Sequence, residues 1–131
     1  SYIAGVTVGL DLTLRDVQGR LKKSGLPWEI SKSFEQSAPL GIFKSYDPDI
    51  INLQNLSFSC SVNKDIRQRG NTCDMLFPIK SLICILSRLW VLRPGDIIYT
   101  GTPSGVGPLE SGDRVYIESP VIGSFSWTLA S

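Results

Sequence analysis

Three polar side chains in the first part of the chain could act together on one small ligand. Asp11 lies in the apolar, β-branched run of residues 6–12, where a carboxylate needs a partner or a chemical task. Arg15 and Gln18 follow three residues apart, so on a helix they share one face and could converge with Asp11. A salt-bridge cluster of Asp11, Arg15 and Asp16 explains the pattern equally well, because one carboxylate does not supply the six oxygens that Mg²⁺ requires.

A second segment that could bind a ligand is residues 95–107, with the sequence GDIIYTGTPSGVG. The glycines leave backbone N–H groups accessible, and these groups could hold an anion together with hydroxyls such as that of Thr102. The segment is not a nucleotide-binding P-loop, because it lacks the Gly-Lys-Ser/Thr ending and no helix follows it. Most sequences of this kind form only a tight turn between two strands. An anion-binding loop and a tight turn therefore both remain possible interpretations.

Lys32 lies within residues 30–34, two positions from an apolar residue on each side, Ile30 and Phe34. A lysine in such a place either extends its ammonium into solvent or carries a fixed charge within a site. The local pattern alone favours the solvent-exposed position.

A short helix is predicted for residues 14–24, directly after the segment that contains Asp11. Thr13 offers an N-cap hydroxyl, Asp16 stands three residues later as in a capping box, and Gly-Leu-Pro at 25–27 ends the helix. Residues 6–12 are predicted to form a buried strand before it. The end of this strand and the first helical turn would bring the polar side chains together.

The middle of the chain predicts a hairpin and a second helix. Residues 56–62 alternate between apolar and polar side chains, and a turn at 63–65 leads into residues 66–68, which is typical of a β-hairpin. Pro78 opens the second helix, whose apolar residues recur at helical spacing up to Leu89.

The last part of the chain predicts antiparallel β-structure, because its strands follow one another too closely for parallel crossovers. The predicted strands cover residues 96–100, 114–118 and 124–129. The whole chain, residues 1–131, is expected to form a single domain.

Composition limits the possible partners. Thirteen basic and twelve acidic residues leave a net charge of +1, which provides no field for nucleic acid or an anionic membrane surface. The most apolar stretch, residues 76–92, is too short and too charged to span a bilayer. Three widely spaced cysteines and no histidine indicate neither a disulfide framework nor a zinc site.

Several blocks of this sequence occur in the order that is typical of one enzyme family. They are Gly9-Leu10-Asp11-Leu12-Thr13-x-Arg15-Asp16-x-Gln18, Gly25-Leu26-Pro27-Trp28, Lys32-Ser33-Phe34, Arg67-Gln68-x-Gly70-x-Thr72-x-x-Met75-x-Phe77 and Gly101-Thr102-Pro103. Together they resemble the fumarylacetoacetate hydrolase family, and within it the small acylpyruvate hydrolases. The resemblance implies an α+β, β-rich fold, in which a mixed β-sheet roll carries two or three short helices.

The resemblance also implies a reaction and the residues that perform it. Such enzymes use Mg²⁺ or Mn²⁺ to break a carbon–carbon bond in acylpyruvates, and decarboxylation of oxaloacetate or keto–enol isomerisation on the same metal scaffold is the alternative activity. By position, Asp11 is a metal ligand, and Arg15 with Lys32 neutralises the charge of the substrate and of the enolate. Gln18 and Thr102 help these two residues to bind the small α-keto acid. Family members are commonly homodimers, and the small ones are mitochondrial or cytoplasmic.

Two parts of the family pattern are not found in this sequence. Upstream of the position of Ser1, members carry a Glu-x-Glu metal-binding pair and a histidine–glutamate pair on a lid, whereas this chain has no histidine and no Glu-x-Glu. We therefore expect the domain to be incomplete at its N-terminal side and most metal ligands to come from the missing part. An inactive, truncated paralogue that binds or dimerises is the alternative. Lys64 also replaces a common glycine, which predicts strain or a different turn there.

Overall fold

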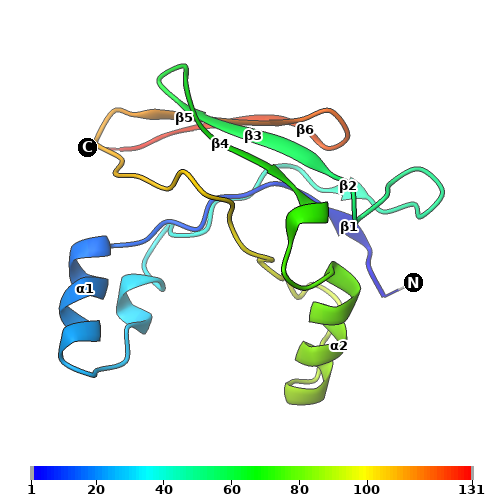
Figure 1. The fold of residues 1–131 in the computed structure, drawn as a ribbon, viewed down its shortest axis with the longest axis horizontal. Helices are drawn as coiled ribbons and strands as arrows, with labels where there is room; N and C mark the ends of the chain where they lie inside the picture. The colour runs from blue at the N-terminus through cyan, green and yellow to red at the C-terminus, as the bar shows by residue number, and fades with distance from the viewer. Residues whose placement is uncertain (1, 131) are drawn as a thin grey trace.

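The computed structural model describes residues 2–130 as an antiparallel sheet with two helices beneath one face (Figure 1). The main sheet has the strand order β4-β3-β5-β6, and a small second sheet pairs β1 with β2. The strands are β1 Gly5–Val6, β2 Lys44–Ser45, β3 Ser57–Val62, β4 Asp65–Asn71, β5 Arg114–Ser119 and β6 Gly123–Thr128. The helices are α1 Arg15–Lys23 and α2 Ile79–Leu89, with 3₁₀ turns η1 Glu29–Ser31 and η2 Thr72–Asp74. The α+β, β-rich class is confirmed, and the strand pairings within residues 2–130 are all antiparallel rather than mixed.

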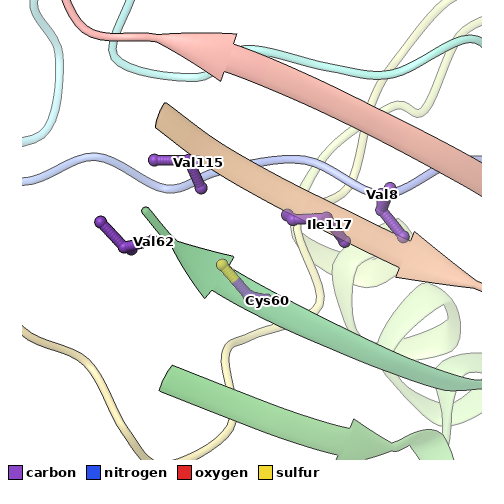
Figure 2. Packing of buried hydrophobic residues seen from close by; sticks show 5 residues of the cluster. All are labelled: Val8, Cys60, Val62, Val115 and Ile117. Carbon is purple, nitrogen blue, oxygen red and sulfur yellow. The ribbon is translucent and has the colours of Figure 1, made fainter. Parts of the chain in front are cut away.

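The core lies between the main sheet and the segment that contains Val8 (Figure 2). Cys60 and Val62 of β3 stand directly opposite Ile117 and Val115 of β5, so the four side chains share one face of the sheet. All five residues are buried. Burial of each aliphatic member stabilises the fold by about 1.5–3 kcal/mol, so this cluster holds the centre of the sheet together.

The β3–β4 hairpin is confirmed, and it turns at Asn63 and Lys64. Their φ angles are 50° and 80°, which is typical of the two-residue type I′ turn that matches strand twist. A lysine is disfavoured in this left-handed region, where a glycine is not. The expected strain at Lys64 is therefore present, and the hairpin forms despite it.

β4 contains one residue more than β3 along their shared edge. Cys60 pairs with Gln68, but Ser61 pairs with Ile66, so Arg67 has no partner in the register. Such a β-bulge bends the strand and redirects the neighbouring side chains.

α1 confirms the helix predicted for residues 14–24, although it begins differently. Its N-cap is Leu14, which makes no side-chain cap hydrogen bond, so the predicted cap at Thr13 is wrong. The Thr13 hydroxyl donates instead to the Asp11 carbonyl oxygen at 3.3 Å. The helix ends as predicted, with Gly25 in the left-handed region at φ 64°.

α2 confirms the second predicted helix, and it lies at the opposite end of the molecule from α1 (Figure 1). None of its residues is buried, and apolar side chains such as Ile85 and Leu89 are exposed. Across the described part of the chain, no helix has the length and apolar character needed to cross a membrane.

Two predicted strands differ from the structure. Residues 96–100 pair with no strand within the described part of the chain, and both Ile97 and Tyr99 are exposed. Within residues 6–12 only Val6 belongs to a strand, and the rest of the segment pairs with residues 37–41 through an isolated bridge at Gly9 and single backbone hydrogen bonds. For residues 96–100 the prediction was wrong because an apolar pattern shows that a segment can be extended, but not that a neighbouring strand edge is within reach.

Candidate active site

Two antiparallel segments, residues 8–14 and 31–41, form one wall of the site. Backbone N–H groups of the first donate to carbonyl oxygens of the second at 2.8–3.0 Å, in the pairs Leu10–Pro39, Leu12–Ser37 and Leu14–Ser31. These bonds bring Asp11 and Lys32 together, although 21 positions separate them in the sequence.

The Lys32 ammonium lies between two oxygen atoms of the opposite segment. Its Nζ donates to Asp11 Oδ1 at 2.6 Å and to Thr13 Oγ1 at 2.9 Å. The side chains of Lys32 and Asp11 are 33% and 49% exposed, so water screens the ion pair only in part. The solvent-exposed position that the local pattern favoured for Lys32 is therefore wrong, and the ammonium is a fixed charge beside Asp11.

α1 continues directly from this wall and carries two further predicted site residues. Gln18 is 8% exposed, whereas Arg15 in the first turn is exposed. Asp16 forms an exposed ion pair with Arg20 at 3.6 Å. The alternative of a structural cluster of Asp11, Arg15 and Asp16 is wrong, because neither acid pairs with Arg15.

The glycine-rich loop, residues 95–107, packs against the edge strand β4. Thr102 Oγ1 and the Pro103 carbonyl oxygen each lie 2.8 Å from Nε2 of Gln68. A Cβ atom on Gly105 would lie 1.9 Å from the Arg67 carbonyl oxygen, so the loop and β4 approach each other along their backbones. The interpretation as a tight turn between two strands is wrong, because residues 96–100 form no strand.

Tyr99 attaches the beginning of this loop to the wall that contains Asp11. Its hydroxyl donates to the Ala38 carbonyl oxygen at 2.9 Å, and a Cβ atom on Gly9 would lie 3.2 Å from that hydroxyl. Burial raises the pKa of the Tyr99 phenol, and the negative charge of Asp11 raises it further. The phenol therefore lies within electrostatic range of the Asp11 carboxylate.

The wall, α1 and the loop line one open hollow of about 2210 Å³, together with α2 and the inner face of the sheet. All five predicted site residues line it, namely Asp11, Arg15, Gln18, Lys32 and Thr102. Sites for small molecules measure roughly 300–1,000 Å³, so a keto acid alone would leave most of this volume empty. The five residues share this hollow with many others, and of the five only Asp11 and Lys32 are in direct contact, so their chemical roles stay predictions.

Among the polar residues of the hollow that were not predicted as site residues, Thr13, Gln68 and Tyr99 form side-chain hydrogen bonds that join its segments. Thr13 was assigned to the helix cap, and Tyr99 to a strand. Gln68 did carry a signal in the sequence, because it belongs to the family block Arg67-Gln68-x-Gly70-x-Thr72. No local pattern identifies its hydrogen-bond partner, which lies 34 positions away.

The surroundings of Asp11 test its predicted role as a metal ligand. Within residues 2–130, no three His, Cys, Asp or Glu side chains gather closely enough to hold a metal ion. Mg²⁺ and Mn²⁺ prefer several oxygen ligands, of which Asp11 offers one carboxylate. The described residues therefore do not form a complete site for either ion.

Comparison with known proteins decides the family. The family model for the fumarylacetoacetate (FAA) hydrolase C-terminal domain matches residues 1–130. The chain belongs to this family. The resemblance that the sequence blocks indicated is thereby confirmed, and the hollow lined by Asp11 and Lys32 is the candidate site of a fumarylacetoacetate hydrolase family domain.

Two curated relatives share this part of the family sequence. Oxaloacetate tautomerase YcgM from Escherichia coli (strain K12) is 50% identical over 115 residues, which cover 88% of this chain and 52% of that protein. The mitochondrial oxaloacetate tautomerase FAHD1 from Homo sapiens is 43% identical over 129 residues, which cover 97% of this chain and 56% of that protein. The chain thus spans about half the length of these relatives.

A solved structure of the family has the same fold. The crystal structure of fumarylpyruvate hydrolase from Pseudomonas aeruginosa in complex with Mn²⁺ and pyruvate matches with a TM-score of 0.90 at 36% identity. The match covers 96% of this chain and 54% of that chain. The family fold is therefore confirmed for almost the whole chain.

Proposed function

We propose that the protein containing this chain is an enzyme that acts on small α-keto acids, with keto–enol tautomerisation of oxaloacetate as its first activity. The observation that carries the proposal is that Asp11, Arg15, Lys32 and Thr102 line one hollow. The two relatives at 50% and 43% identity are oxaloacetate tautomerases, which supports oxaloacetate as the substrate.

Charge explains how these residues would act. Oxaloacetate has two carboxylates, and removal of a proton from the carbon next to its keto group places negative charge on the keto oxygen. Arg15 and Lys32 would neutralise a carboxylate and the enolate oxygen, because fixed cations stabilise charge that develops during a reaction. Gln18 and Thr102 would orient the bound acid through hydrogen bonds.

The proposal includes Mg²⁺ or Mn²⁺ as a cofactor with Asp11 as one ligand. Asp11 Oδ1 binds Lys32, and Oδ2 has no hydrogen-bond partner within residues 2–130. The remaining ligands would come from other parts of the protein, since the relatives are about twice as long as this chain. In this proposal residues 1–131 form one domain that upstream residues complete, in a mitochondrial or cytoplasmic protein.

Hydrolytic cleavage of the carbon–carbon bond in acylpyruvates is the second candidate activity. It is supported by the fumarylpyruvate hydrolase that shares the fold at 36% identity. Attack of water on the distal carbonyl would release an enolate, which the same two cations would stabilise. Decarboxylation of oxaloacetate also passes through an enolate, so only product analysis separates the three activities.

Assays of the complete protein test this proposal. Ultraviolet absorbance follows the conversion of enol to keto oxaloacetate, and a coupled assay follows release of pyruvate from oxaloacetate and from acylpyruvates. Each assay is run with Mg²⁺, with Mn²⁺ and with a chelator. The expected result is metal-dependent tautomerisation that is faster than either release of pyruvate. Absence of all three activities would favour the alternative, a non-catalytic paralogue that binds or dimerises.

A further inference from the structure

Gln68 holds the glycine-rich loop through both hydrogens of its side-chain amide. Its Nε2 lies 2.8 Å from Thr102 Oγ1 and 2.8 Å from the Pro103 carbonyl oxygen. A carbonyl oxygen only accepts hydrogen bonds, so Pro103 requires the NH₂ group, rather than the amide oxygen, on this side. The Thr102 oxygen therefore accepts the second hydrogen.

This contact determines what the Thr102 hydroxyl can do. A threonine hydroxyl has one hydrogen to donate. Because Gln68 donates to the oxygen, the Thr102 hydrogen points to a different acceptor. Thr102 lines the hollow together with Arg15 and Lys32, and a ligand drawn there by two positive charges offers anionic oxygens as acceptors.

The bulge in β4 directs Gln68 toward the loop. Gln68 stands opposite the buried Cys60, so both side chains point to the inner face of the sheet. Arg67 is the extra residue of the bulge, and a Cβ atom on Gly105 would lie 1.9 Å from its carbonyl oxygen. Only glycine permits this approach, so the loop and the strand are held at a fixed separation beside Gln68.

We propose that Gln68 is a positioning residue, which directs the Thr102 hydroxyl hydrogen toward an anionic oxygen of the bound keto acid. Gln68 acts through Thr102 and does not itself contact the substrate. The identity of the ligand rests on the proposed function, whereas the attachment of the loop rests on the contacts of Gln68 alone.

Kinetics of the complete protein test the link between the two residues. Gln68→Met keeps the side-chain volume, removes both donors, and raises KM for oxaloacetate about three- to tenfold with a smaller change in kcat. Thr102→Val gives a similar rise. In the Thr102→Val background, Gln68→Met changes KM by less than about twofold, because Gln68 acts through Thr102. An unchanged KM in Gln68→Met, or effects that multiply in the double variant, would overturn the proposal.

Gln54→Met is the matched control for loss of an amide contact. Gln54 accepts a hydrogen bond from the Ile79 N–H at 3.1 Å, at the start of α2 rather than at the loop. The control lowers thermal stability to a similar extent but leaves KM within about twofold of the wild type. If it raises KM as Gln68→Met does, general destabilisation explains both results and the positioning role is rejected.

Hydrogen exchange separates the positioning role from the proposed activity. Amides of residues 101–107 exchange faster in Gln68→Met and in Gly105→Ala, which pushes the loop away from Arg67. Gly112→Ala is the control. It introduces similar left-handed strain, because φ is 86° at Gly112 and 99° at Gly105, but a Cβ atom at Gly112 would meet no other atom within 4 Å. Gly112→Ala is expected to leave hydrogen exchange of residues 101–107 unchanged. An inactive wild type with faster loop exchange in Gln68→Met would reject the proposed function and keep the attachment by Gln68. Unchanged exchange would reject the attachment as well.

Discussion

Lys32 and Asp11 hold each other in place at the centre of the site. The distance of 2.6 Å between Lys32 Nζ and Asp11 Oδ1 joins two chain segments, and Thr13 binds the same ammonium. A partly exposed ion pair contributes only about 0–1 kcal/mol to stability. The main effect of the ion pair is therefore to hold the Lys32 ammonium at a fixed position within the hollow, rather than to stabilise the fold.

Asp11→Ala is expected to abolish metal-dependent turnover of the complete protein while leaving the fold intact. The fold survives because Asp11 is 49% exposed and its ion pair contributes little to stability. Steady-state assays with Mg²⁺, together with circular dichroism, measure both effects. Asp16→Ala is the matched control, since the exposed Asp16–Arg20 pair has a separation of 3.6 Å. Undiminished activity in Asp11→Ala would contradict the assignment of Asp11 as a metal ligand.

Lys32→Met is expected to lower kcat/KM by about a hundredfold or more, which is typical for loss of a group that stabilises charge in a transition state. Measured kinetics are compared with those of Lys23→Met, which removes an exposed lysine in the last turn of α1. The control should change kcat/KM by less than about twofold. Equal kinetics in both variants would return Lys32 to a purely structural role.

At the scale of elements, the β3–β4 turn combines a favourable backbone shape with an unfavourable residue. Lys64→Gly is expected to stabilise the protein by about 1 kcal/mol, because Lys64 has φ 80° and a glycine avoids most of the left-handed strain. Urea unfolding measures the change. Lys64→Ala retains a Cβ atom and should give no comparable gain. A loss of stability in Lys64→Gly would show that the lysine is not strained.

Asp113 joins this turn to the turn that precedes β5. Its carboxylate accepts hydrogen bonds from the Glu110 N–H at 2.8 Å and from the Asn63 side-chain amide at 2.6 Å, and these bonds lower its pKa. The pKa in the folded state therefore lies below the unfolded value of about 3.9. The ionised carboxylate stabilises the fold above this pH, and the contribution is lost as the pH falls through the folded pKa.

Urea unfolding of Asp113→Asn at several pH values tests this contribution. The variant should be less stable than the wild type at pH of about 7, and the difference should shrink as the pH falls below about 3.9. Asp65→Asn, on the opposite side of the hairpin turn, controls for the exchange of an acid for an amide. A difference for Asp113→Asn that does not depend on pH would contradict the role of its charge.

At the scale of the whole molecule, the face of the sheet that carries the helices is open. The hollow of about 2210 Å³ lies there, and large apolar side chains such as Trp90 and Val91 are exposed. Soluble proteins rarely leave contiguous apolar patches of this kind uncovered. We therefore expect further polypeptide against this face in the functional protein.

We expect the complete protein to be a homodimer, as the family resemblance of the sequence implied. A stable dimer interface buries about 1,200–2,000 Å² in total, an area that the exposed apolar side chains can contribute to. Sedimentation equilibrium over a range of concentrations measures the mass. A mass equal to one chain at every concentration would contradict the expectation, and the cover of the open face would then have to come from the same chain.

Local patterns in the sequence predicted the two helices and the β3–β4 hairpin, whereas the family resemblance supplied the full set of five polar site residues. Apolar spacing placed α2, the left-handed glycine at position 25 ended α1, and alternation placed β3. These features depend on residues only a few positions apart, so they can be read along the chain. The ordered family blocks added the expected fold, which the comparisons confirm.

Only the tertiary structure decided which side chains meet. Lys32 reaches Asp11 across 21 positions, and Gln68 reaches Thr102 across 34. Residues 96–100 have a strand-like sequence but no strand edge beside them within the described chain. Such contacts depend on how distant segments pack and on which backbone edges remain free. Residues that are close in the sequence do not determine either property.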